Sequence, residues 1–101
     1  MEQMIENDAP IAGLEQFVNE FYQDRVLEFN EMQEFRKEKR FEDIRKLAHK
    51  WKGFCAPYGF QGLESLSTEL EVECKSSNVE KIDELISKIS KYMIEKGKII
   101  K

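Results

Sequence analysis

Apolar residues recur at steps of three and four along almost the whole chain, and this period limits the possible fold more than any other feature. It matches one face of an α-helix, where residues three and four apart are neighbours. The first such run predicts one long helix that starts with Asp8 as its N-cap, has Pro10 in its first turn and ends in the charged run 36–40. Its apolar stripe comprises Ile11, Leu14, Phe17, Val18, Phe21, Tyr22, Val26, Phe29, Met32 and Phe35.

Three further runs with the same period predict three more helices, over residues 41–58, 63–74 and 79–93. Pro57 and Gly59 predict the end of the first of these, because proline lacks a backbone donor and glycine readily adopts the left-handed cap conformation. A turn separates the last two helices, with Ser77 or Asn78 as the N-cap. Gly97 is the expected end of the last helix.

Four amphipathic helices joined by short links bury their stripes most simply as an antiparallel up-down bundle. We therefore expect an all-α four-helix bundle formed by a single domain over residues 1–101, with a core at about 8–96. A short N-terminal segment is expected to be helical or loose, and residues 1–7 and 97–101 are expected to be loose ends. Because all four stripes are needed inside one bundle, we expect a monomer.

Composition argues against several classes of protein. The net charge of −4 is unlike that of a general nucleic-acid-binding domain. No apolar run approaches the roughly 20 residues of a membrane span, and the acidic start "MEQMIENDAP" lacks the apolar segment of a signal peptide. Cys55 and Cys74 match no metal or redox spacing and are read as reduced thiols. Together these features indicate a cytoplasmic protein with no metal site of its own.

His49 is the only histidine in the chain, and a helical wheel places it opposite the apolar stripe of its helix. A solvated surface histidine is the ordinary explanation for such a position. Two features weigh against that explanation. Gly53 lies one turn later in what reads as mid-helix, where it costs about 1 kcal/mol relative to alanine, and with Ala56 it leaves open space. Lys52 and Arg45 surround the ring with positive charge that suits an anionic group.

A carboxylate from the third helix is expected beside His49. If the chain turns near Phe60, residues of the two antiparallel helices whose numbers sum to about 120 lie abreast. A carboxylate there would accept the Nδ1 proton and leave Nε2 as a free nucleophile. The sequence has no glycine-rich nucleotide loop and no metal cluster, so a partner protein would have to complete any reaction. The expected pairs are His49 with Glu71, Lys52 with Thr68, and Gly53 with Ser67.

The stretch "LAHKWKGFCAPYGFQGLESLSTELE", residues 47–71, resembles a histidine-containing phosphotransfer (HPt) domain of bacterial-type two-component phosphorelays. The family pattern is matched by Ala48-His49, Lys52-Gly53, Gly59, Leu63 and Leu70-Glu71. The chain length and the helical frame fit as well. Phe54 and Cys55 depart from the pattern, because small residues are usual there, and Pro57 is also less common at its position.

The resemblance implies that His49 accepts a phosphoryl group from a receiver-domain aspartyl phosphate and passes it to another receiver. Lys52 would steady the phosphoryl charge, Gly53 would permit close docking, and Glu71 would orient the ring. The chain would then be a phosphoryl carrier rather than an enzyme with an ATP or metal site, and Mg²⁺ would be held by the receiver. A hybrid histidine kinase is a further expected partner. The residues expected to dock the partner are Arg45, Lys46, Lys50, Ala56, Glu64, Ser67 and Thr68.

Two alternatives remain open from the sequence. The chain could be the phospho-accepting domain of a chemotaxis-like histidine kinase, in which a separate ATP-binding domain phosphorylates His49. It could instead be a helical adaptor that binds a partner without phosphotransfer. The combination of His49, Lys52 and Gly53 argues against the adaptor.

Overall fold

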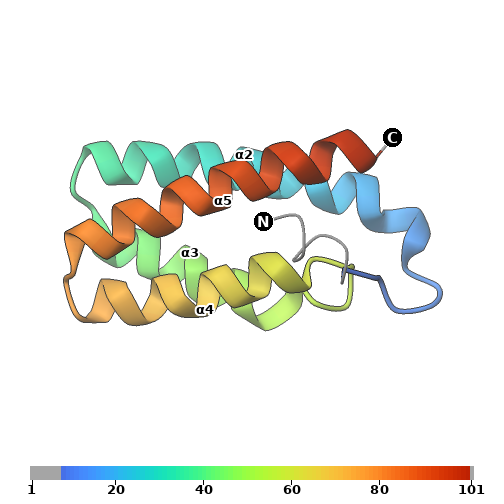
Figure 1. The fold of residues 1–101 in the computed structure, drawn as a ribbon, viewed down its shortest axis with the longest axis horizontal. Helices are drawn as coiled ribbons and strands as arrows, with labels where there is room; N and C mark the ends of the chain where they lie inside the picture. The colour runs from blue at the N-terminus through green and yellow to red at the C-terminus, as the bar shows by residue number, and fades with distance from the viewer. Residues whose placement is uncertain (1–7, 101) are drawn as a thin grey trace.

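The computed structural model describes residues 8–100, and over this range the chain is an antiparallel bundle of four α-helices (Figure 1). This confirms the all-α four-helix fold expected from the sequence. None of the helices in the described range is long and apolar enough to cross a membrane. The elements are a short 3-10 turn η1 (Glu15–Phe17), α2 (Val18–Lys37), α3 (Phe41–Phe54), α4 (Gln61–Lys75) and α5 (Val79–Ile99).

The apolar stripes meet in one core that runs the length of the bundle. Burial of such large side chains contributes about 1.5–3 kcal/mol each, which makes this core the main source of stability. Trp51 is fully buried, and its indole nitrogen donates to Glu28 Oε1 at 2.8 Å, so α3 is tied to α2 without an unpaired polar atom. The largest fully buried side chains are Trp51, Tyr92, Phe60, Met32, Ile44, Leu63, Leu70, Ile82 and Ile89.

The turns after α2 and after α4 lie where the sequence predicts them. Lys39 and Ser77 adopt positive φ angles of 59° and 56°, which reverse the chain after α2 and after α4. Asn78 is the N-cap of α5, because its side chain accepts a hydrogen bond from the backbone nitrogen of Lys81 at 3.2 Å. Gly59 has a φ of 87° in the loop between α3 and α4, as its left-handed role requires.

The beginning of the first helix was predicted wrongly. α2 starts at Val18 and not near Pro10, because Gly13 has a φ of 97° that no helix can contain. The preceding residues instead form a strap, residues 8–14, that crosses the loop between α3 and α4 and pairs Pro10 with Tyr58 in an isolated bridge. Ile11 and Phe17 were expected on the buried stripe, but they are 59% and 44% exposed.

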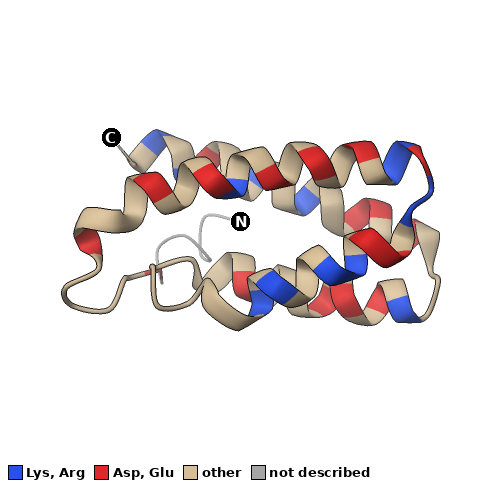
Figure 2. Cartoon of the chain, turned by 180° about the vertical axis from the view of Figure 1, so that it is seen from behind, with Lys and Arg blue, Asp and Glu red and all other residues tan. Residues whose placement is uncertain are grey.

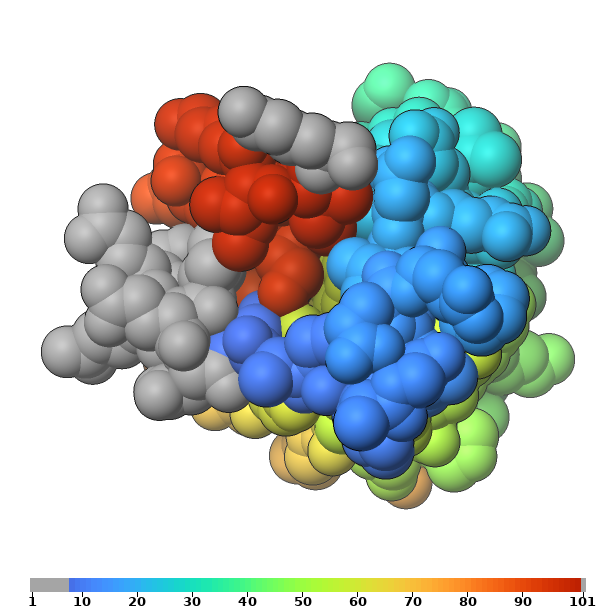
Figure 3. All heavy atoms as spheres, turned by 90° about the vertical axis from the view of Figure 1, so that its right-hand side faces the viewer, coloured from blue at the N-terminus to red at the C-terminus, as the bar shows by residue number. Residues whose placement is uncertain are grey.

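Asp8 caps a different helix from the one expected. Its Oδ1 accepts from the backbone nitrogen of Gly62 at 3.0 Å, in the first turn of α4. Its Oδ2 accepts from Lys96 Nζ at 2.9 Å and from the hydroxyl of Tyr92. The side chains of Asp8 and Lys96 are both buried, so the pair closes the end of the bundle where the strap lies across it (Figure 3).

Two helix ends also differ from their predicted positions. α3 ends at Phe54, a few residues before Pro57. α5 continues through Gly97 to Ile99, so residues 97–99 are helical rather than loose. The lack of a side chain at Gly97 serves packing here, because a Cβ atom would lie 2.3 Å from the hydroxyl of Tyr22 on α2. The expected loose segment 1–7 and residue 101 lie outside the described residues.

Replacing Gly59 by alanine should destabilise the fold more than the same change at Gly13. Both glycines have positive φ, so each substitution carries a backbone penalty of about 1–2 kcal/mol. At Gly59 a Cβ would also lie 2.7 Å from the backbone nitrogen of Pro10, whereas at Gly13 it meets nothing within 4 Å. Urea denaturation should therefore show an additional loss of about 1–3 kcal/mol for Gly59→Ala. Equal losses would mean that the strap does not press on this loop.

Candidate functional site

His49 projects from the outer face of α3, and its side chain is 64% exposed. The buried residues Ala48 and Trp51 fix the rotation of the helix and turn His49 toward solvent. The ring Nδ1 lies 2.7 Å from Glu71 Oε2. Among residues 8–100, no group forms a hydrogen bond with Nε2. A neutral ring that donates from Nδ1 therefore presents an unprotonated Nε2 to solvent.

Glu71 comes from α4, and only 4% of its surface is exposed. The pairing of His49 with Glu71 that the helix register predicts is therefore observed. The register places Lys52 abreast of Thr68, but the Nζ of Lys52 contacts Glu71 Oε1 at 2.7 Å. Thr68 instead donates from its hydroxyl to the Glu64 carbonyl of its own helix at 2.9 Å. A lysine side chain is long enough to reach one further turn along the neighbouring helix, and the buried carboxylate attracts it.

The hydrogen bond from Lys52 is the main cause that holds the pKa of Glu71 below its ordinary value. Burial acts in the opposite direction, but the hydrogen bonds from Lys52 and His49 outweigh it and lower the pKa to about 2. Glu71 is therefore a carboxylate at neutral pH. It can hold the Nδ1 proton and stabilise positive charge that develops on the ring.

Gly53 leaves open space next to His49. It lies at the penultimate position of α3 and not in mid-helix as expected, and a Cβ atom there would meet nothing within 4 Å. A glycine in the last turn of a helix costs less than one in its interior, so the stability argument for a functional glycine is weaker than the sequence suggested. The surface beside the ring is nevertheless open, so Gly53 still leaves room for a partner to approach.

The seven expected docking residues do not form one exposed surface. Ser67 is fully buried, and its hydroxyl has no hydrogen-bond partner among the described residues, so its expected place on the docking face is corrected. Lys50 is half exposed and paired with Glu28 of α2. Glu64 accepts from the backbone nitrogen of Ala56 at 3.2 Å and so supports the loop after α3. Arg45, Lys46, Lys50 and Thr68 keep partly or fully exposed side chains, while Ala56 and Glu64 are half-buried.

Charges of opposite sign separate onto neighbouring helices on this side of the molecule. Figure 2 shows acidic positions along α2 and basic positions along α3. The basic positions near His49 are Arg45, Lys46, Lys50 and Lys52. The surface around the ring is therefore suited to a negatively charged group.

The buried Arg25 and its half-buried partner Glu28 were not predicted from the sequence. Arg25 is 6% exposed, donates to Glu28 Oε1 at 2.7 Å, and stacks its guanidinium 4.3 Å from the ring centre of Phe21. Burial raises the pKa of Glu28, but hydrogen bonds from Lys50 and Trp51 and the charge of Arg25 outweigh it, and the net pKa is lowered. Arg25 lies four residues from both Phe21 and Phe29, so the helical period could have placed it on the buried face of α2.

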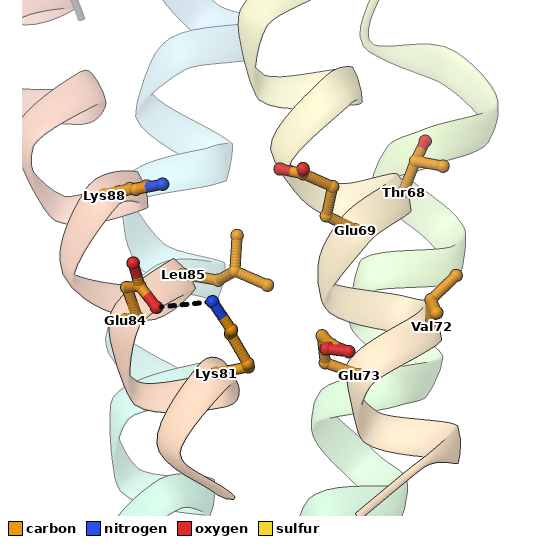
Figure 4. A pocket seen from close by; sticks show the side chains of 8 residues that line it. All are labelled: Thr68, Glu69, Val72, Glu73, Lys81, Glu84, Leu85 and Lys88. Atoms are coloured by element: carbon orange, nitrogen blue, oxygen red, sulfur yellow. Dashed lines mark ion pairs between the residues drawn. The ribbon is translucent and has the colours of Figure 1, made fainter. Parts of the chain in front are cut away.

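A separate hollow of about 380 Å³ lies between α4 and α5, away from α3 (Figure 4). Lys81 and Glu84, both on α5, pair at 3.4 Å along one wall of the hollow. Thr68 is the one lining residue that also belongs to the expected docking residues. Its walls carry charges of both signs. The hollow is lined by Thr68, Glu69, Val72, Glu73, Lys81, Glu84, Leu85 and Lys88.

Both cysteines are buried free thiols, and burial raises the pKa of Cys55 to about 12 and that of Cys74 to about 11. Neither is therefore poised as a nucleophile at neutral pH. Within residues 8–100 no group of three or more His, Cys, Asp or Glu side chains is placed to hold a metal ion.

No family model, curated protein or solved structure matches the chain. The site combines an exposed imidazole held by a buried carboxylate, a lysine bound to that carboxylate, and open space beside the ring.

Replacing Glu71 by glutamine should cost stability at neutral pH and progressively less in acid. The pKa of Glu71 is lowered in the folded state, so its stabilising effect is fully present above the ordinary value of 4.5 and is lost as the pH falls toward 2. The difference in unfolding free energy between wild type and Glu71→Gln should be about 1–3 kcal/mol at pH 6 and shrink between pH 5 and about 2. Urea denaturation across this range measures it.

Glu69→Gln is the matched control, because it makes the same change in net charge at an exposed position of α4. A difference for Glu71→Gln that stays constant down to pH 2.5 would contradict the ion pair with Lys52.

Proposed function

We propose that the chain is a phosphorelay intermediate that accepts and passes on a phosphoryl group at Nε2 of His49. One observation carries the proposal: Nδ1 of the exposed ring lies 2.7 Å from the buried carboxylate of Glu71, which leaves Nε2 free. A surface histidine without a role has no need of a buried and ionised partner, because burying a charge is costly. The resemblance of residues 47–71 to HPt domains supports the same function.

The proposed transfer is an in-line displacement at phosphorus. The lone pair of Nε2 forms the new N–P bond, the P–O bond to the donor aspartate breaks, and its electron pair leaves with the aspartate carboxylate. The ring becomes positively charged and keeps its proton on Nδ1, where Glu71 accepts the hydrogen bond. Return of the phosphoryl group to a receiver aspartate reverses each step.

The proposed donor and acceptor are receiver domains, which would bring the acidic pocket and the Mg²⁺ ion. Gly53 supports close approach, because no side chain stands between a docking surface and this part of α3. The proposal includes a monomer in the cytoplasm, a hybrid histidine kinase upstream, and no nucleic-acid partner. The same open geometry at Nε2 also suits phosphorylation by a separate ATP-binding kinase domain, which is the second candidate.

Incubation with phosphorylated receivers, or with a kinase domain and ATP, should place an acid-labile phosphate on His49. A panel of ³²P-labelled receiver domains and a chemotaxis-type kinase domain separates the two donors. His49→Gln should take no label and should keep its circular dichroism spectrum, because the side chain is exposed and the glutamine amide can still donate to Glu71. If the wild-type protein takes no label from any donor in the panel, the phosphorelay proposal is wrong and the adaptor remains.

Glu71→Ala should slow transfer by about tenfold or more, because the ring loses the group that fixes its tautomer and orientation. Glu71→Gln should be closer to wild type, since an amide oxygen can still accept the Nδ1 proton. Rates are measured by rapid quench with the same phosphorylated receiver, and Glu69→Ala serves as the control on α4. Equal rates for wild type and Glu71→Ala would remove the role of Glu71.

A further inference from the structure

Arg45 lies one turn before His49 on the same face of α3. Its Nε donates to Glu42, and its Nη1 lies 3.8 Å from Glu71 Oε2. This oxygen is the one that contacts Nδ1 of His49, so the guanidinium and the imidazole converge on a single atom.

The guanidinium of Arg45 has donors to spare. It carries five N–H groups, and the hydrogen bond to Glu42 is the one that it makes within the described part of the chain. At 3.8 Å the contact with Glu71 is an ion pair that lies beyond hydrogen-bond distance. The side chain is 28% exposed, so the free donors are accessible from the surface.

The other cations near the ring are placed differently. Lys52 is bound to Glu71 at 2.7 Å, and Lys50 is bound to Glu28 of α2. Lys46 borders a hollow between α2 and α3 that also contains Phe35 and Leu47. Arg45 is therefore the cation beside His49 that both contacts the carboxylate of Glu71 and keeps N–H donors free to bind another group.

We propose that Arg45 binds the phosphoryl group on His49, the role that the HPt resemblance implies for Lys52. This inference rests on the proposed function. Upon phosphorylation the guanidinium leaves Glu42 and donates to two phosphoryl oxygens, while Lys52 continues to hold Glu71. A planar guanidinium fits two oxygens of a phosphoryl group better than an ammonium does.

The role predicts two effects of opposite sign on the transfer equilibrium. Arg45→Gln should lower the equilibrium constant for forming phosphohistidine by about tenfold or more, because the charge-assisted hydrogen bonds to the phosphoryl group are lost. Glu42→Gln should raise it by up to about fivefold, because Glu42 competes for Arg45 through an exposed ion pair. Arg45→Lys should lie between wild type and Arg45→Gln.

The equilibrium constant separates this role from docking. Docking strength changes the forward and reverse rates together and leaves the distribution of phosphate between the free proteins unchanged. A ³²P-labelled receiver that phosphorylates His49 is mixed with each variant until the label no longer shifts, and both phosphoproteins are quantified. Lys91→Gln is the matched control, since it removes an exposed positive charge on α5, away from the site and from the expected docking residues.

Each outcome bears on one of the two proposals. If wild type takes the label but Arg45→Gln keeps an equilibrium constant within twofold of it, Arg45 does not bind the phosphoryl group and the phosphorelay function stands. Equal changes in forward and reverse rates with an unchanged constant assign Arg45 to docking and also overturn the inference. If wild type takes no label, the phosphorelay function fails and the role of Arg45 fails with it.

Discussion

The buried carboxylate of Glu71 is the interaction on which the rest of the site depends. It lies at the seam between α3 and α4, accepts from Nδ1 of His49 and from Nζ of Lys52 at 2.7 Å each, and has Arg45 as a more distant cation. A charge with so little exposed surface is stable only with such partners. For this reason the side chains of His49, Lys52 and Arg45 on α3 all converge on the Glu71 carboxylate of α4. As a result the ring has a fixed side toward the protein and a free nitrogen toward solvent.

The bundle provides the rigidity that this arrangement needs. Ile44, Ala48 and Trp51 are fully buried on the opposite side of α3 and set its rotation. The carboxylate of Glu28 receives hydrogen bonds from Trp51 and Lys50, which holds α3 against α2 close to the site. At the end of the bundle, Asp8 joins the strap to α4 and α5 through Gly62 and through Lys96. A positioned nucleophile benefits from such support, because small displacements of a reacting group reduce the rate strongly.

Much of this could be predicted from the sequence, because helical periodicity is local. The four helices and the outward position of His49 followed from steps of three and four between apolar residues. The pairing of His49 with Glu71 followed from a turn near Phe60 and from equal rises along two antiparallel helices. The reach of Lys52 did not follow, because a flexible side chain chooses among partners by charge and burial rather than by register. Ser67 illustrates the same limit: a small polar residue at a helix contact can be buried as easily as exposed.

The N-terminal strap, residues 8–14, is the segment whose structure the local sequence pattern predicted least well. The apolar steps at Ile11, Leu14 and Phe17 suit a helix, yet Asp8 is drawn to partners more than fifty residues away, on α4 and α5. The sequence by itself determined the helical class, the antiparallel order and the pairing of the single histidine with a carboxylate, since these depend on spacing along the chain. The tertiary structure alone decided which cation holds Glu71, which helix Asp8 caps and which polar residues lose contact with water. These choices depend on the rotation and spacing of packed helices, which no local pattern specifies.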